Sequence, residues 1–269
     1  MRKNTYLVLH DFTPVGDAAL DYAVNLSSNL NNEIKIVHLV DSESKINEAN
    51  VKLEAIISNI DKAENTIISP LVYVGSIFED IAVIVKKEDV NLIIMGTHGP
   101  KGMQKVFGSF AMKVITSSDV PFFVIQKDTE IKSLKKILVP IDLEKESLQI
   151  VNVAGDLANI YNAEVFLVAE QQNDELLSRK IKNRILIVKK QYEERGIKCT
   201  IELIDEKSGS YKSKIMNYSR TNNIDLIAIA YHTASIIPQF DTFAQKLITN
   251  DEMLPCVIIN SKMSSSFFF

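Results

Sequence analysis

The sequence predicts an α/β protein built from two tandem, doubly wound, five-stranded parallel sheets. Short apolar segments rich in β-branched residues alternate with amphipathic helical segments along the whole chain. This alternation is typical of a parallel sheet that is covered by helices on both faces. The pattern of the first half also returns in the second half, which indicates two copies of one unit.

The two copies can be aligned residue by residue. Asp11, in the segment LVLHD, and Asp142, in the segment LVPID, are 131 residues apart. Farther along, VNLIIM at 90–95 matches IDLIAI at 224–229, and these segments are 134 residues apart. The change from 131 to 134 indicates a three-residue insertion in the second copy, between positions 168 and 208.

The boundary between the copies is predicted near residues 127–134, a polar stretch that precedes the next apolar run. It gives a first domain at 1–130, a second domain at 131–263 and a tail at 264–269. The tail reads SSSFFF, and it is either a frayed end or a segment that docks on a hydrophobic surface.

The elements of the two copies follow the same order. In the first copy, apolar runs predict strands at 5–10, 33–40, 67–74, 91–95 and 121–126. Amphipathic patterns between them predict helices at about 15–29, 45–62, 76–88 and 108–117. The second copy repeats the strands near 135–141, 163–169, 197–204, 225–231 and 256–260. Pro121 opens the last strand of the first copy, a position where proline is tolerated.

Composition argues against several classes of protein. The net charge is −4 and no long run of Lys or Arg occurs, so we expect no nucleic-acid partner. The apolar runs are short, and Asp11 follows the start too early for a signal peptide, so we expect no membrane partner and a cytoplasmic location. Two cysteines, Cys199 and Cys256, do not make a disulfide framework, and we expect both to be small core residues.

Two loops are expected to flank the ligand crevice of the first sheet. In doubly wound sheets, ligands bind beyond the carboxyl ends of the strands, where the winding direction reverses. One loop follows the first strand at His10 and Asp11. The other follows the fourth strand and contains four of the nine glycines of the chain: Gly96, Gly99, Gly102 and Gly108. Such a loop can point backbone N–H groups at a phosphate, although a plain tight turn also fits the pattern.

Several motifs resemble those of a known family. An aspartate ends the first strand of each copy, and Val37-His38-Leu39 ends the second strand of the first copy. The fourth strand runs into the segment Met95-Gly96-Thr97-His98-Gly99, which Gly108-Ser109 follows. With these motifs the whole chain resembles the universal stress protein family, as a tandem pair.

The resemblance implies a Rossmann-like sheet with strand order 3-2-1-4-5 in each copy. Family members often dimerise through their last strands. Here the two copies would pair in this way within one chain, around 121–126 and 255–260, as an intramolecular pseudo-dimer. A homodimer of the whole chain is left open.

The resemblance also implies a site for ATP or another adenine nucleotide in the first copy, with Mg²⁺ as an accompanying ion. ATP-binding members carry a G-x2-G-x9-G-[S/T] loop, whereas eight residues separate Gly99 from Gly108 here. By position, Asp11 would contact the adenosine and Leu39 would line the adenine site. The expected nucleotide-binding residues are Asp11, Leu39, Gly96, His98, Gly99, Gly108 and Ser109.

The second copy lacks the glycines of this loop. At a spacing of 134 residues, Ala230, Thr233, Ile236 and Thr242 replace Gly96, Gly99, Gly102 and Gly108, and Phe243 replaces Ser109. Bulky and β-branched residues disfavour positive φ and the close approach of a phosphate. We therefore expect the second copy to keep the fold without the nucleotide site.

Other chemistry has little support in the sequence. Three histidines, His10, His38 and His98, could lie near Asp11 and Asp41. Adjacent strand residues point to opposite faces, however, and no ligand pair has zinc-site spacing, so no metal site is expected. No Walker loop or nucleophile elbow occurs, and no catalytic residue is expected. The leading function is a stress-response protein that binds an adenine nucleotide. The alternatives are a non-binding interaction module of the same fold and a slow ATP hydrolase.

Overall fold

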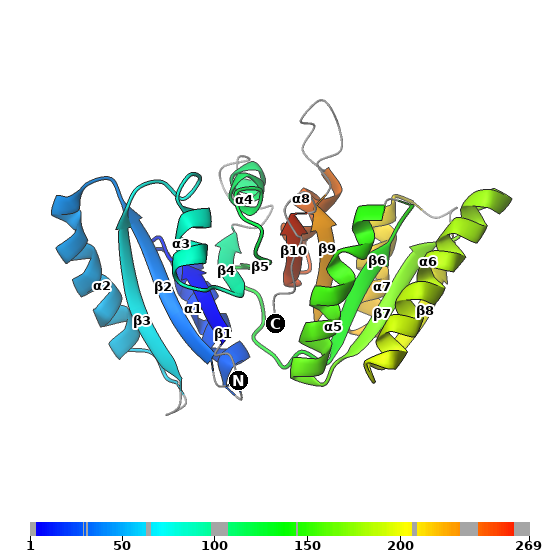
Figure 1. Cartoon of the computed structure of the whole chain (residues 1–269), viewed down its shortest axis with the longest axis horizontal. Helices are drawn as coiled ribbons and strands as arrows, with labels where there is room; N and C mark the ends of the chain where they lie inside the picture. Colours follow the sequence, from blue (N-terminus) through cyan, green and yellow to red (C-terminus); the bar gives the residue numbers. More distant parts are fainter. Residues whose placement is uncertain are drawn as a thin grey trace.

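The computed structural model of the chain describes residues 4–28, 30, 32–62, 66–97, 107–143, 145–205, 209–231 and 242–260. These residues form one ten-stranded sheet flanked by helices (Figure 1). The strand order is β3-β2-β1-β4-β5-β10-β9-β6-β7-β8. Each half therefore has the order 3-2-1-4-5 when its own strands are counted along the chain, and the predicted fold class is confirmed.

The described residues of the first half form nine main elements. They are β1 (Asn4–Leu9), α1 (Pro14–Ser27), β2 (Asn32–Val40), α2 (Ile46–Ser58), β3 (Ile67–Val74), α3 (Ile81–Lys87), β4 (Leu92–Thr97), α4 (Phe107–Ile115) and β5 (Phe122–Gln126). A short 3-10 helix, η1 (Glu43–Lys45), precedes α2. Helix α1 begins at Pro14, because proline has a helical φ and lacks an N–H that the first turn would leave unpaired.

The second half repeats this order. Its elements are β6 (Lys136–Ile141), η2 (Lys145–Leu148), α5 (Ile150–Tyr161), β7 (Glu164–Glu170), α6 (Glu175–Glu194), β8 (Cys199–Ile204), α7 (Tyr211–Asn222), β9 (Leu226–Tyr231), α8 (Thr242–Ile248) and β10 (Cys256–Asn260). Helix α6 has 20 residues, whereas its counterpart α2 has 13. The longer helix does not contain the insertion, because the paired residues Val165 and Cys199 lie 34 positions apart in sequence, as Ile34 and Ile68 do.

The third helix begins later than the sequence predicts. Residues 76–80 match the helical pattern but form a turn, and α3 starts at Ile81. The carboxylate of Asp80 accepts a hydrogen bond from the backbone N–H of Ser76 at 2.8 Å. This bond closes the turn against Gly75, where an added Cβ would lie 2.2 Å from Asp80 Oδ2.

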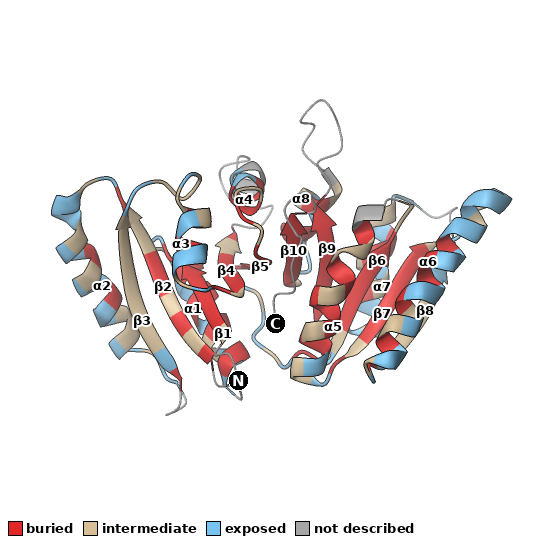
Figure 2. Ribbon diagram, viewed as in Figure 1, coloured by how far each residue is buried: buried red, intermediate tan, exposed pale blue. Residues whose placement is uncertain are grey.

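Two hydrophobic layers cover the sheet. One face packs against α1, α2, α5 and α6, through residues such as Leu20, Leu53 and Leu157. The other face packs against α3, α4, α7 and α8, through residues such as Ile84 and Ile215. The central strands are buried, while the outer strand β3 and the outward faces of the helices are partly or fully exposed (Figure 2).

The two halves meet at β5 and β10, whose pairing is antiparallel. Phe123 faces Val257 at the centre of this pair, and these residues are equivalent at the 134-residue spacing. The side-chain amide of Gln126 donates to the carbonyl oxygen of Asn250 at 2.7 Å. The equivalent amide of Asn260 donates to the carbonyl oxygen of Thr116 at 3.1 Å. The contact thus has a pseudo-twofold axis, and the expected intramolecular pairing of the last strands is present.

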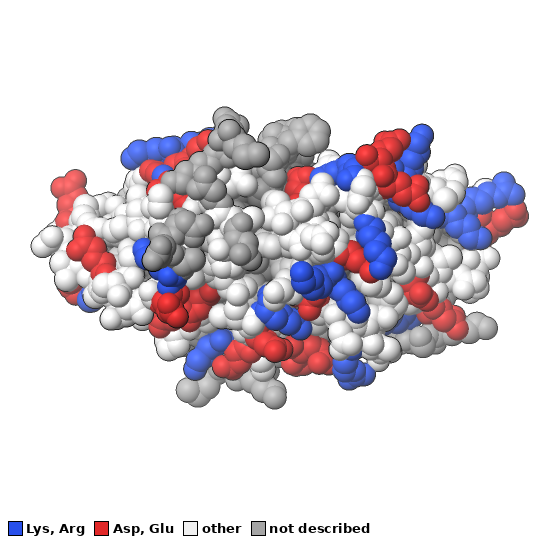
Figure 3. All heavy atoms as spheres, turned by 90° about the horizontal axis from the view of Figure 1, so that it is seen from below, with Lys and Arg blue, Asp and Glu red and all other residues white. Residues whose placement is uncertain are grey.

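Charges of both signs lie side by side on the face of the molecule that is viewed in Figure 3. Among the described residues, no helix has the length and apolar character that crossing a membrane would require.

Candidate functional site

A cavity of about 280 Å³ lies at the carboxyl ends of the strands of the first half. It opens where β1 lies between β2 and β4, which is the point where the winding direction of this half reverses. Its walls come from β1 and the following loop, from the start of α1, from the end of β2, from the turn after β3, from the end of β4 and from α4. The first half therefore has a hollow where ligands of doubly wound sheets bind.

Three of the predicted nucleotide-binding residues line this cavity: Asp11, Leu39 and Gly96. Gly108 and Ser109 lie in the first turn of α4. His98 and Gly99 lie outside the described residues. The structure therefore brings together residues at the carboxyl ends of three different strands, β1, β2 and β4.

Sequence reasoning missed part of the cavity wall. Val15, Gly16, Ile77 and Phe110 also line it. Val15 and Phe110 were indistinguishable from ordinary core positions of amphipathic helices. Ile77 follows Gly75-Ser76, a pair that returns as Gly209-Ser210 at the 134-residue spacing, and this repeat is the signal that the sequence offers for it.

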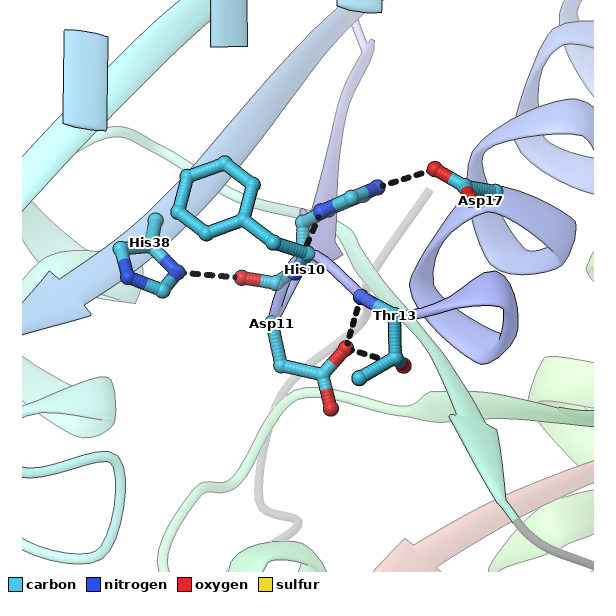
Figure 4. Close-up of polar contacts among 6 residues, drawn as sticks. His10, Asp11, Thr13, Asp17 and His38 are labelled. Atoms are coloured by element: carbon cyan, nitrogen blue, oxygen red, sulfur yellow. Dashed lines mark hydrogen bonds and ion pairs between the residues drawn. The ribbon is translucent and has the colours of Figure 1, made fainter. Parts of the chain in front are cut away.

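Hydrogen bonds hold His10 as a neutral imidazole beside the first turn of α1. Its Nδ1 accepts a hydrogen bond from the backbone N–H of Phe12 at 3.1 Å, so Nε2 carries the proton and donates to Asp17 Oδ1, also at 3.1 Å (Figure 4). Burial lowers the pKa of His10, and the nearby carboxylate of Asp17 offsets only part of this effect.

His38 is tied to the end of β1. Its Nδ1 donates to the carbonyl oxygen of His10 at 2.8 Å (Figure 4). The ring of Phe12, whose backbone has a φ of 61°, lies 4.1 Å from the His38 ring between centroids. His38 is therefore a hydrogen-bonded residue near the end of β2.

Asp11 points away from the His10 ring (Figure 4). Its Oδ1 accepts two hydrogen bonds from Thr13, from the backbone N–H at 3.1 Å and from the hydroxyl at 2.6 Å. These bonds fix the carboxylate while using only one of its oxygens. Within the described parts of the chain, no group of three His, Cys, Asp or Glu side chains is arranged to hold a metal ion.

Gly96 is required by packing as well as by the cavity. A Cβ at this position would lie 2.4 Å from Val15 Cγ1 and 2.5 Å from the carbonyl oxygen of Val15. Both distances are far below van der Waals contact, so only glycine lets the first turn of α1 approach the end of β4 so closely. The sequence assigned this glycine to ligand approach alone.

The two cysteines have no features of a nucleophile. Cys256 is fully buried in β10, and burial raises the pKa of its thiol. Cys199 is partly buried at the start of β8, where burial raises its pKa to about 11. Reactive thiols instead have lowered pKa values and accessible sulfur atoms. Their expected role as small packing residues agrees with these positions.

Comparisons with known proteins agree on the fold. The model of the universal stress protein family matches residues 4–126. A universal stress protein from Archaeoglobus fulgidus is 15% identical, with a TM-score of 0.67 over 97% of this chain and 100% of that protein. A functionally unknown protein from Pseudomonas aeruginosa is 14% identical, with a TM-score of 0.64 over 96% of this chain and 92% of that protein.

The same arrangement also occurs in a protein of another kind. The cytoplasmic domain of a prokaryotic cation chloride cotransporter is 11% identical, with a TM-score of 0.56 over 100% of this chain and 98% of that one. A comparison with curated protein sequences gives no match. At such identities, the structural likeness shows the fold alone.

The fold and the cavity define a tandem α/β protein with a hollow at the switch point of its first half. With the match over residues 4–126, the first half belongs to the universal stress protein family, and the second half has the same fold. The family resemblance predicted from the motifs is confirmed.

Proposed function

We propose that the first half binds an adenine nucleotide in the cavity at the ends of β1, β2 and β4. The observation that carries this proposal is the convergence of Asp11, Leu39 and Gly96 on one hollow at the switch point. The volume of about 280 Å³ is near the lower end of small-molecule sites, which begin at roughly 300 Å³. A base and a ribose fit such a space, and the phosphates would extend beyond it.

The chemistry of the wall suits each part of the ligand. Leu39, Ile77 and Met95 offer apolar contacts to a base. The carboxylate of Asp11, held by Thr13 through Oδ1, can accept from ribose hydroxyls. The phosphates would lie toward the start of α4, where Gly108 and Ser109 stand and where N–H groups of the first helical turn favour anions. Mg²⁺ would then arrive bound to the phosphates.

Binding rather than turnover is the activity that these residues favour. The neutral His10 already uses both ring nitrogens, one toward Phe12 and one toward Asp17. It therefore has no nitrogen left to take a proton from an attacking water. Slow hydrolysis and a non-binding interaction module stay as the alternatives that an experiment has to separate from binding.

The test is isothermal titration of the whole chain with ATP, ADP and AMP, with and without Mg²⁺. The expected result is one nucleotide per chain. Asp11→Ala should weaken binding at least tenfold, whereas the matched change Asp142→Ala in the second half should leave it unchanged. Gly108→Val should also weaken binding, with Thr242→Val as its control.

Three results would contradict the proposal in different ways. No heat with any nucleotide would favour the interaction module. Two nucleotides per chain would contradict the predicted loss of the second site. Release of ADP from ATP over hours, abolished by Asp11→Ala, would favour the slow hydrolase.

A further inference from the structure

The second half has a counterpart to each wall of the cavity, and three of these counterparts are large or charged. At the repeat spacings, Tyr211 stands where the first half has Ile77, and Glu170 stands where it has Leu39. Phe243 stands in place of Ser109. The equivalent region of the second half therefore differs in size and charge, since smaller residues also occur there: Ala244 stands in place of Phe110.

Tyr211 reaches across the strand ends of the second sheet. Its hydroxyl lies 3.3 Å from the carbonyl oxygen of Ile141 and 3.2 Å from that of Val168. Both oxygens are within hydrogen-bond distance, so the hydroxyl can donate to either of them. Ile141 ends β6, and Val168 belongs to β7. Their equivalents in the first half are His10 and Val37, which both line the open cavity. The phenol thus lies over the place that is hollow in the first half.

The ring of Tyr211 is covered by neighbours of its own half. Phe243 stacks on it with a centroid distance of 5.4 Å and an angle of 12° between the ring planes. One turn farther along α7, the buried ammonium group of Lys214 forms an ion pair with Glu170. Burial raises the pKa of the Tyr211 phenol, with the charges of Asp142 and Glu170 adding to the effect. The hydroxyl therefore stays protonated as a donor.

The hydrogen bond from Tyr211 to Ile141 has a counterpart in the first half that a different residue makes. There, His38 donates to the carbonyl oxygen of His10, and Ile77 is too short and apolar to reach it. In the second half Ala169 takes the place of His38 and cannot donate. The Tyr211 hydroxyl supplies the missing donor, and its planar ring stacks on a second aromatic ring as a bound aromatic molecule would.

We propose that Tyr211 is an intramolecular ligand: its phenol occupies the ligand site of the second half and closes this half to small aromatic molecules. The proposal is independent of which ligand the first cavity takes. It implies that removing the ring opens a site for a small phenol, held by the same two carbonyl oxygens and by Phe243.

The test uses 4-methylphenol, the side chain of tyrosine as a free molecule, and toluene, which lacks the hydroxyl. Isothermal titration of the whole chain should give one more bound 4-methylphenol in Tyr211→Ala than in the wild type. Toluene should bind the variant at least fivefold more weakly, because it cannot donate to Ile141 and Val168. Tyr218→Ala, which removes the other tyrosine of the same helix, a residue that packs near Phe166, should bind no additional molecule.

Two further variants keep the test decisive. Tyr211→Phe retains the ring and should stay closed to 4-methylphenol. Tyr211→Ile introduces isoleucine, which the first half has at the equivalent position 77. If the alanine variant does not fold, titration of the isoleucine variant with 4-methylphenol tests the proposal in its place. The proposal is overturned if neither shortened variant gains a site, if toluene binds as well as 4-methylphenol, or if Tyr218→Ala gains the same site.

Discussion

Gly96 offers the most direct test of how the cavity is built. It lies near the end of β4 between the buried residues Met95 and Thr97, and its α-hydrogen faces the first turn of α1. Gly96→Ala would place a Cβ 2.5 Å from the carbonyl oxygen of Val15, whereas ordinary contacts begin at 3.4 Å. The start of α1 would therefore have to retreat by about 0.9 Å, the difference between these two distances. Backbone atoms of a packed helix cannot swing aside as a flexible side chain can.

The expected cost follows from this overlap. Overpacking of a buried position typically costs about 1–3 kcal/mol, and a clash with backbone belongs at the upper end of that range. Alanine has less conformational freedom than glycine in the unfolded chain, and this difference stabilises the folded state by about 0.4–1 kcal/mol. The net loss is about 2 kcal/mol. At roughly 2–4 °C per kcal/mol for a chain of this size, the Tm should fall by roughly 4–8 °C.

Thermal unfolding followed by circular dichroism measures this effect, and the second half supplies a matched control. Ala230 is equivalent to Gly96 and is buried with its Cβ in place. Ala230→Gly creates no overlap and should cost only about 0.5–1 kcal/mol, from the greater freedom of glycine in the unfolded chain. A Tm for Gly96→Ala within 2 °C of the wild type, or a fall no greater than that of Ala230→Gly, would refute the packing role of Gly96.

Two other predictions concern polar groups. Because burial lowers the pKa of His10 below its ordinary value of 6.5, its contribution to stability is complete above about pH 6.5 and is lost as the pH falls through the lowered pKa. The Tm of the wild type should therefore drop more between pH 7.5 and 5.5 than that of His10→Gln, and equal drops would contradict this role. Asp225 Oδ2 accepts from the backbone N–H groups of Lys135 and Lys136 at 2.9 Å each, and its equivalent Asn91 accepts from that of Thr5. In urea unfolding, Asp225→Asn should lower the free energy of unfolding by less than about 1 kcal/mol. Asp225→Ala should lower it by about 2 kcal/mol, because it leaves the two N–H donors without their acceptor. Equal losses in the two variants would argue against the hydrogen bonds.

Most of the fold could be predicted from the sequence because hydrophobic periodicity reports burial directly. Strands that are buried on both faces, such as β1 and β4, read as continuous apolar runs. The late start of α3 could not be predicted in this way. Residues 76–80 have a helical pattern, and the turn depends on a hydrogen bond between Asp80 and Ser76 that periodicity does not register.

The site could be predicted only where residue type and position both carried information. Asp11 and Gly96 were identified because a polar residue and a glycine interrupt or end apolar strands. The clash that requires Gly96 could not be foreseen, because it depends on how closely Val15 approaches in space. Tyr211 was missed because it belongs to no motif. Its role can be inferred only from the structure, in which its hydroxyl contacts carbonyl oxygens of β6 and β7.

Fusion of two copies in one chain explains how one site can be open while the other is filled. In a symmetric homodimer, each residue occurs in both subunits, so a tyrosine at the position of Ile77 would fill both sites at once. A tandem chain removes this constraint, and Tyr211 can replace the isoleucine in one half alone. The filled half still supports the open one. The hydroxyl of Thr97, which directly follows Gly96, lies 3.4 Å from the carbonyl oxygen of Ile248 at the end of α8 and 3.2 Å from that of Ile125. The second half is thereby in hydrogen-bond contact with the strand end from which the glycine-rich loop departs, so it can lose its own ligand site and still be needed for the geometry of the first.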